Sequence, residues 1–313
     1  MPTVPGSRKG RKKQSESTPN ASAPHVRQRG FFPADDGTSL YYEVLGHGRP
    51  LVLCYGLTCQ REHWRYQVEH FSKHYQVVLF DYRGHPCSDI PKNEKHLTVE
   101  WCGKDVLSLI RYLKLERPVC MGHSLGVSIV VSAISQCPEL FHGAVFVCGA
   151  VSNPFDHMFH TDKLNAIFQI YSKLCELAPD TMTEVWRRFT ARTPFNFFMA
   201  SRFGFNPFRA QDRDVNMYLE GVNRTPMSVF HTLLRDYVDF DGRSLLGKIA
   251  MSVLVVAGES DYITPLKVQE EMVKLLPNSQ LELVPYGSHN AHMDYADRVN
   301  RRIETFLKEI GYV

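Results

Sequence analysis

Ser124 lies in a pentapeptide whose residue types and spacing could make a serine hydroxyl reactive. The pentapeptide at 122–126 reads Gly-His-Ser-Leu-Gly, and it separates an apolar run at 117–121 from a longer one at 127–134. The short run is typical of a buried strand and the longer one of a packed helix. Gly-x-Ser-x-Gly at a strand-to-helix junction predicts a nucleophile elbow, a turn so tight that glycine is needed on both sides. Glycine and serine also meet in ordinary turns, so the motif needs partners.

An acid and a histidine follow two later apolar runs, in the chain order Ser, Asp, His. Asp261 comes after the run at 252–257, and His289 comes after the run at 281–284. Ligands of open α/β sheets bind at the carboxyl ends of the strands, so these side chains are expected at one edge of the sheet. Serine needs a base to accept its proton, and a carboxylate on the other ring nitrogen orients that base. We therefore predict Ser124 as the nucleophile, His289 as the base and Asp261 as the orienting acid.

The oxyanion of an acyl-transfer reaction would form beside Ser124. The helix that follows the serine points its free N–H groups at this position. Leu57 follows another apolar run, at 51–55, and ends at the same edge. The backbone N–H groups of Leu57 and Leu125 are therefore predicted to form the oxyanion hole.

Other polar residues near these positions leave alternatives open. Glu259 stands two residues before Asp261 and is an alternative acid, although the position of Asp261 favours the latter. His292 follows His289 by about one helical turn and is either a supporting residue or a surface histidine. His123 is expected to be a structural or pocket-edge residue, because the elbow turns its side chain away from the serine. The pair at 62–63, Glu-His, is expected on a helix surface.

The elements that would position these residues alternate between apolar strands and amphipathic helices. Apolar runs at 51–55, 77–80, 117–121, 143–148, 252–257 and 281–284 predict an α/β protein with a mostly parallel sheet covered on both faces. A hairpin at 31–45 would add an antiparallel edge, and Thr98 would cap a helix that runs to about Leu115.

The alternation stops between residues 152 and 246, where helical segments are rich in Phe and Met. We predict a helical cap at 152–246 over a core formed by 29–151 and 247–313. Its aromatic side chains would divide between the cap's own core and either an apolar pocket or a lipid-facing patch.

The N-terminal residues differ in composition from the rest of the chain. Residues 1–30 carry seven Lys and Arg against one Glu, a charge of +6, which leaves −3 for the remainder of a chain whose net charge is +3. Residues 1–28 are therefore predicted to form a disordered basic tail. The basic run at 8–13 is interpreted first as a solvated tail, with a localisation signal or a contact with anionic lipid or nucleic acid as alternatives.

Nothing in the near-neutral body indicates a site built for a polyanion, so the prediction requires no nucleic acid as a partner. A weak contact with a membrane surface, through the cap or the tail, remains an expectation. The sequence contains no apolar stretch long enough to span a bilayer and no apolar signal region. Its eight cysteines have no zinc-site spacing, and we interpret them as reduced thiols of a cytoplasmic protein with no metal.

On these residues the sequence resembles the α/β-hydrolase superfamily from about Phe31 to the C-terminus. The matching features are Tyr-Gly at 55–56, Asp-Tyr-Arg-Gly-His-Pro-Cys-Ser at 81–88, the pentapeptide at 122–126, Gly-Glu-Ser-Asp at 258–261 and Gly-Ser-His at 287–289. The resemblance implies an eight-stranded sheet, a cap after strand six, and hydrolysis of acyl bonds without a cofactor. We predict a serine hydrolase that cleaves a small hydrophobic ester, or a related acyl bond, through an acyl-enzyme.

Relatives that share the triad also cleave C–C bonds, release N-terminal proline or carry out cofactor-free halide peroxidation, so these activities stay open as alternatives. A binding or scaffold protein on the same fold is the non-enzymatic alternative. Such proteins usually lose a member of the triad, and this sequence retains all three residues.

Overall fold

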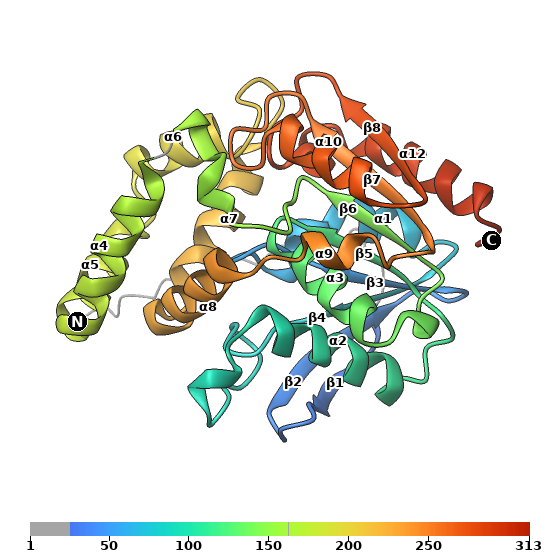
Figure 1. Ribbon diagram of the computed structural model, residues 1–313, viewed down its shortest axis with the longest axis horizontal. Helices are drawn as coiled ribbons and strands as arrows, with labels where there is room; N and C mark the ends of the chain where they lie inside the picture. Colours follow the sequence, from blue (N-terminus) through green and yellow to red (C-terminus); the bar gives the residue numbers. More distant parts are fainter. Residues whose placement is uncertain (1–25, 162) are drawn as a thin grey trace, which may run out of the picture.

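Eight strands form one sheet in the computed structural model, which describes residues 26–161 and 163–313 (Figure 1). Their order is β1-β2-β4-β3-β5-β6-β7-β8. The β1–β2 and β2–β4 pairs are antiparallel and all other pairs are parallel, which confirms the predicted fold class. The strands are β1 (Val26–Pro33), β2 (Ser39–Leu45), β3 (Pro50–Cys54), β4 (Gln76–Phe80), β5 (Val119–His123), β6 (Gly143–Val147), β7 (Ser252–Gly258) and β8 (Ser279–Val284).

The central strands are apolar along their whole length because helices cover both faces of the sheet. Every residue of β3, β5 and β6 is buried, whereas the edge strand β8 is only partly buried. One helical layer contains α2 (Val99–Tyr112), α3 (Leu125–Gln136), α9 (Arg243–Leu246) and α10 (Leu266–Leu275), which contact one another in succession. In the other layer α1 (Arg65–Phe71) contacts α11 (Ala291–Asp294) and α12 (Ala296–Glu309).

Three predicted boundaries differ from the observed ones. The cap was predicted to end at residue 246, but α9 belongs to the helical layer that covers the sheet. Residues 26–28, which the composition places in the basic tail, begin β1, and Val26 and Gln28 pair with β2. Thr98 caps α2 as predicted, since its hydroxyl accepts the N–H of Trp101 at 3.1 Å, but the helix ends at Tyr112 rather than near Leu115. The rest of the predicted tail, including the basic run at 8–13, lies outside the described residues.

In the described part of the chain, five α-helices lie between β6 and α9, and they project from the sheet on the left of Figure 1. They are α4 (Leu164–Leu177), α5 (Pro179–Phe189), α6 (Pro194–Phe203), α7 (Asp212–Arg224) and α8 (Met227–Asp239). α8 joins them to the sheet domain, because Leu233 and Tyr237 belong to the main hydrophobic core. A separate small core forms where Phe205 and Val215 meet Met293. Within the described ranges, no helix is both long and apolar enough to cross a bilayer.

Candidate active site

Ser124 occupies the sharp turn between β5 and α3. Its φ of 54° and ψ of −122° are rare for a residue with a side chain, and its N–H donates to the carbonyl of Val147 at 3.1 Å. A Cβ atom on Gly122 would lie 2.5 Å from the carbonyl oxygen of Gly126, and one on Gly126 would collide with the carbonyl of Cys54. Only glycine therefore fits on either side of the serine, and the turn has the geometry of a nucleophile elbow.

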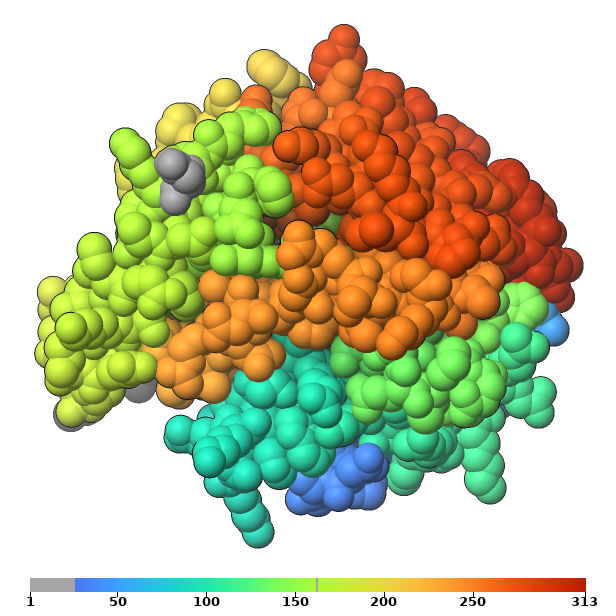
Figure 2. Space-filling model, in the orientation of Figure 1, coloured from blue at the N-terminus to red at the C-terminus, as the bar shows by residue number. Residues whose placement is uncertain are grey.

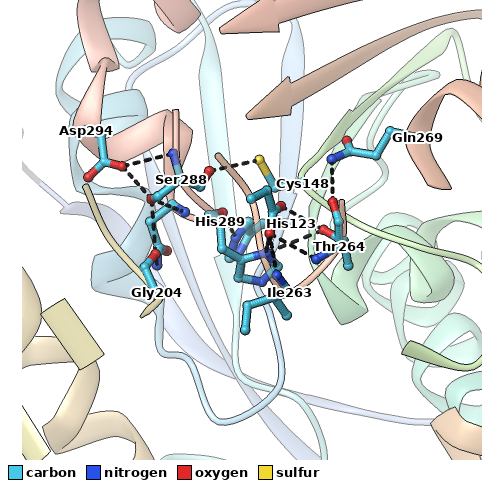
Figure 3. Close-up of polar contacts among 11 residues, drawn as sticks. His123, Cys148, Gly204, Ile263, Thr264, Gln269, Ser288, His289 and Asp294 are labelled. Atoms are coloured by element: carbon cyan, nitrogen blue, oxygen red, sulfur yellow. Dashed lines mark hydrogen bonds and ion pairs between the residues drawn. The ribbon is translucent and has the colours of Figure 1, made fainter. Parts of the chain in front are cut away.

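His289 and Asp261 meet where the loops after β8 and β7 come together. Nδ1 of His289 lies 3.1 Å from Oδ2 of Asp261 and 3.2 Å from Oδ1. The side chain of this carboxylate is fully buried, and its Oδ1 also accepts the N–H groups of Ile263 at 2.8 Å and Thr264 at 2.9 Å. Figure 3 shows that His289, Ile263 and Thr264 lie close together. A carboxylate held in this way favours the tautomer that carries the proton on Nδ1, which leaves Nε2 of His289 free to accept a proton.

Thr264 is part of this arrangement and was missed in the sequence analysis. Its hydroxyl donates to Oδ2 of Asp261 at 2.8 Å and lies 3.4 Å from Nδ1 of His289. The sequence did carry a signal for it. An aspartate that accepts the N–H groups two and three residues ahead is a common turn, and it brings residue i+3 beside the carboxylate.

Glu259 does not face the histidine. It is exposed, and its Oε2 accepts the N–H of Tyr286 at 2.8 Å. Of the two acids left open by the sequence, Asp261 is the one in contact with His289.

Ser124 and His289 both line a cavity of about 580 Å³ between the sheet edge and the helices that follow β6. None of its lining residues, all of them described, is Asp, Glu, Lys or Arg. No hydrogen bond joins Ser124 to His289, both of which are described; such nucleophile–base contacts often tighten only with substrate bound. Most of the wall is apolar, from Leu57, Pro154, Phe155, Met158, Phe159, Phe189, Phe195, Met199, Phe203, Leu219, Val222, Phe230, Leu234 and Ile263.

Beside Ser124, the backbone N–H groups of Leu57 and Leu125 have no acceptor among the described residues. Leu125 is the first residue of α3, and Leu57 lies on the cavity wall. A Cβ atom on Gly56 would lie 3.0 Å from Cβ of Ser124, so glycine lets the loop after β3 approach the serine closely. This arrangement can present two donors to an oxygen bound above Ser124.

The side chain of His123 holds the backbone of His289 through a hydrogen bond. Its Nε2 donates to the carbonyl oxygen of His289 at 3.0 Å, and the two rings are 5.0 Å apart. Burial holds the pKa of His123 well below its usual range, so the ring is neutral near pH 7. His123 is the last residue of β5, so this neutral histidine connects the strand to the loop after β8, across 166 positions of the chain.

Two further histidines, His63 and His292, are buried beside this one. His63 is fully buried, so its prediction as a helix-surface residue was wrong; it lies in a short 3₁₀ helix (Arg61–Trp64), where the assumed α-helical spacing does not apply. His292 is also fully buried, which rules out the surface alternative, and its ring lies 4.5 Å from His123 and 4.9 Å from Trp64. Burial lowers the pKa of His63 to about 4 and that of His292 to about 3.

The described residues offer no cluster of three or more His, Cys, Asp or Glu side chains that could hold a metal ion. All eight cysteines are free, and six of them are buried. Burial raises the pKa of Cys59, which lines the cavity, to about 12. This thiol therefore stays protonated near neutral pH, and Ser124 and His289 are the groups in the cavity suited to nucleophilic chemistry.

Comparison with known proteins assigns the chain to a family. It belongs to the α/β hydrolase fold family, which matches residues 49–296. The chain is 25% identical over 278 residues to pimeloyl-[acyl-carrier protein] methyl ester esterase of Aliivibrio fischeri, covering 87% of this chain and 98% of that one. It is also 25% identical over 290 residues to a non-heme haloperoxidase of Rhodococcus erythropolis, covering 89% and 99%.

Solved structures show the same fold. The bromoperoxidase of Bacillus anthracis superposes with a TM-score of 0.74 at 20% identity, covering 90% of this chain and all of that one. The chain is thus an α/β hydrolase of the esterase and hydrolase type. At these identities its substrate has to be inferred from its own cavity.

Proposed function

We propose that this protein is a serine hydrolase that cleaves uncharged, hydrophobic carboxylic esters through an acyl-enzyme. The observation that carries the proposal is the contact of 3.1 Å between His289 Nδ1 and Asp261 Oδ2 at a cavity that Ser124 also lines. Contact with the carboxylate favours the imidazolium that forms when the base accepts a proton.

In the proposed reaction, Oγ of Ser124 attacks the ester carbonyl carbon as its proton passes to Nε2 of His289. The carbonyl oxygen becomes an oxyanion bound by the N–H groups of Leu57 and Leu125. The C–O bond to the alcohol then breaks, and His289 returns the proton to the departing oxygen. Water, activated by the same histidine, attacks the acyl-enzyme and releases the acid.

The cavity supports the choice of substrate class. A carboxylate or ammonium group on the substrate would lose its hydration without gaining an opposite charge, because no Asp, Glu, Lys or Arg side chain lines the wall. This disfavours a proline aminopeptidase, whose substrate carries a free ammonium group. Aromatic and aliphatic side chains would instead gain stabilisation from burying an acyl chain or aromatic ring.

A fluorophosphonate probe tests the mechanism. We expect it to label the wild-type protein and to leave Ser124→Ala unlabelled, while Ser135→Ala, a control near the end of the same helix, is labelled like the wild type. If the folded wild-type protein is not labelled, the proposed nucleophile is wrong and the scaffold alternative is favoured.

An ester series then tests the substrate class. For p-nitrophenyl esters, we expect kcat/KM to rise with acyl length until the cavity is filled, and to fall when the acyl chain ends in a carboxylate. A negligible, flat response in a protein that the probe does label would favour the C–C hydrolase or haloperoxidase alternatives over a simple ester.

A further inference from the structure

Large apolar side chains are exposed on the segment 185–211, which includes the end of α5 and all of α6. Phe208 is 94% exposed, Phe189 69%, Phe195 65% and Phe198 61%, and Val185 and Met199 are also exposed. Soluble proteins rarely leave so many large apolar side chains in water unless the surface binds something.

The spacing on α6 places several of these residues on one face. Counted from Phe195, the residues at three, four and seven positions further along are Phe198, Met199 and Arg202. All four therefore lie along one side of the helix. Phe197 instead packs against the small core around Phe205. The helix thus has one side packed on the protein, and a second apolar side that faces outward.

The same segment is strongly basic. Residues 185–211 contain five arginines and no Asp or Glu, and all five are exposed. The acid nearest to it on its N-terminal side, Glu184, forms ion pairs with Arg187 at 2.8 Å and Arg188 at 2.6 Å. Residues 184–211 therefore carry a net charge of +4, whereas the chain after residue 30 has a net charge of −3. The remaining three arginines are Arg192, Arg202 and Arg209.

This surface continues into the cavity. Phe189, Phe195 and Met199 are exposed and also line the cavity that contains Ser124. In Figures 1 and 2 the helices α4 to α6 form the outer edge of the molecule, away from the helices that cover the sheet. A lipophilic molecule could therefore move from this edge to Ser124 along apolar side chains.

We propose that residues 185–211 dock on the surface of an anionic phospholipid bilayer, with the Phe side chains inserted among the lipids and the arginines at the headgroups. Exposed aromatic residues flanked by basic ones are the pattern of segments that lie in the membrane interface without crossing it. Docking places the cavity mouth at the bilayer and does not require the proposed hydrolase activity.

A second copy of the chain fits this surface less well. A twofold dimer through the segment would bring two patches of charge +4 together, and like charges across an interface are unfavourable. An anionic bilayer complements both features, because its headgroups attract the arginines and its acyl chains bury the apolar side chains.

The test is co-flotation of the full-length protein with vesicles of phosphatidylcholine alone or mixed equally with phosphatidylglycerol. We expect binding to the anionic vesicles that weakens as salt is raised. Each arginine near an anionic bilayer contributes about fivefold, so Arg192→Gln with Arg202→Gln should lower partitioning about twenty-five-fold. Phe195→Ser with Phe198→Ser should lower partitioning into the anionic vesicles at least about tenfold, because the two serines no longer bury apolar surface among the lipids.

Two matched variants lie elsewhere on the molecule. Phe31→Ser removes a phenylalanine that is 55% exposed on β1, and Arg301→Gln removes an exposed arginine on α12; neither should change binding. Ser124→Ala should also bind vesicles like the wild type, which separates docking from catalysis. Circular dichroism checks that each variant is folded.

Three results would overturn the proposal. The first is no flotation with anionic vesicles. The second is flotation that survives the substitutions at 192, 195, 198 and 202 but is lost when the basic run at 8–13 is neutralised, which would assign binding to the tail. The third is a dimer in sedimentation velocity that Phe195→Ser with Phe198→Ser abolishes, which would make this face an interface between two copies of the chain.

Discussion

His292 should make the stability of the protein fall in mild acid, and its replacement should remove a defined part of that fall. The imidazole is fully buried against Trp64 and His123, and neither ring nitrogen has a hydrogen-bond partner among the described residues. Burial lowers its pKa to about 3, whereas an unfolded histidine titrates near 6.5. As the pH drops below 6.5, the unfolded chain therefore binds a proton that the folded protein does not bind until about pH 3.

The magnitude follows from this difference in pKa. Stability decreases by up to about 1.4 kcal/mol per pH unit for one such group, and integration from pH 7 to pH 5 gives about 2 kcal/mol. His292→Gln or His292→Phe should reduce the loss over this interval by that amount. Any effect of the substitution on the free energy of unfolding that does not depend on pH cancels, because the two pH values are compared within each variant.

Urea unfolding at pH 7, 6 and 5 measures the effect. The buried Asp105 and Asp294, whose pKa values burial raises to about 6, shift stability in the opposite direction. They are present in every variant and cancel in the difference. His47→Gln, at an exposed position, should leave the loss unchanged. If wild type and His292→Gln lose the same free energy between pH 7 and pH 5, the neutral buried imidazole is refuted.

Two further predictions concern the acid of the site. Asp261→Asn should lower kcat for a p-nitrophenyl ester by about 10⁴-fold, as loss of the orienting carboxylate does in other serine hydrolases. Glu259→Gln should retain wild-type kcat. Equal losses in both variants would contradict the assignment of Asp261. Thr264→Val removes the 2.8 Å hydrogen bond to Asp261, worth about 2 kcal/mol to a charged acceptor, so kcat should fall about thirtyfold with little change in KM. Thr264→Ser, which keeps the hydroxyl, should restore most of the activity; failure of this rescue would assign Thr264 a packing role.

Much of the fold could be predicted because its determinants are local. Runs of apolar residues at 51–55 and 143–148 predict buried strands wherever they occur, and both correspond to strands of the sheet. The glycines beside Ser124 are required by the turn itself, as the contacts of a Cβ atom at Gly122 and Gly126 show. The order Ser, Asp, His after three strands is likewise readable along the chain.

The sequence by itself thus determined the strands, the elbow and three candidate residues that follow strand ends. Only the tertiary structure decided that Asp261 rather than Glu259 faces His289, because two residues of one loop point in directions set by the segments packed around them. It also decided that His63 and His292 are buried while Phe195 and Phe198 are exposed. Hydrophobic pattern indicates which residues can be buried, but contacts between distant segments determine which residues are.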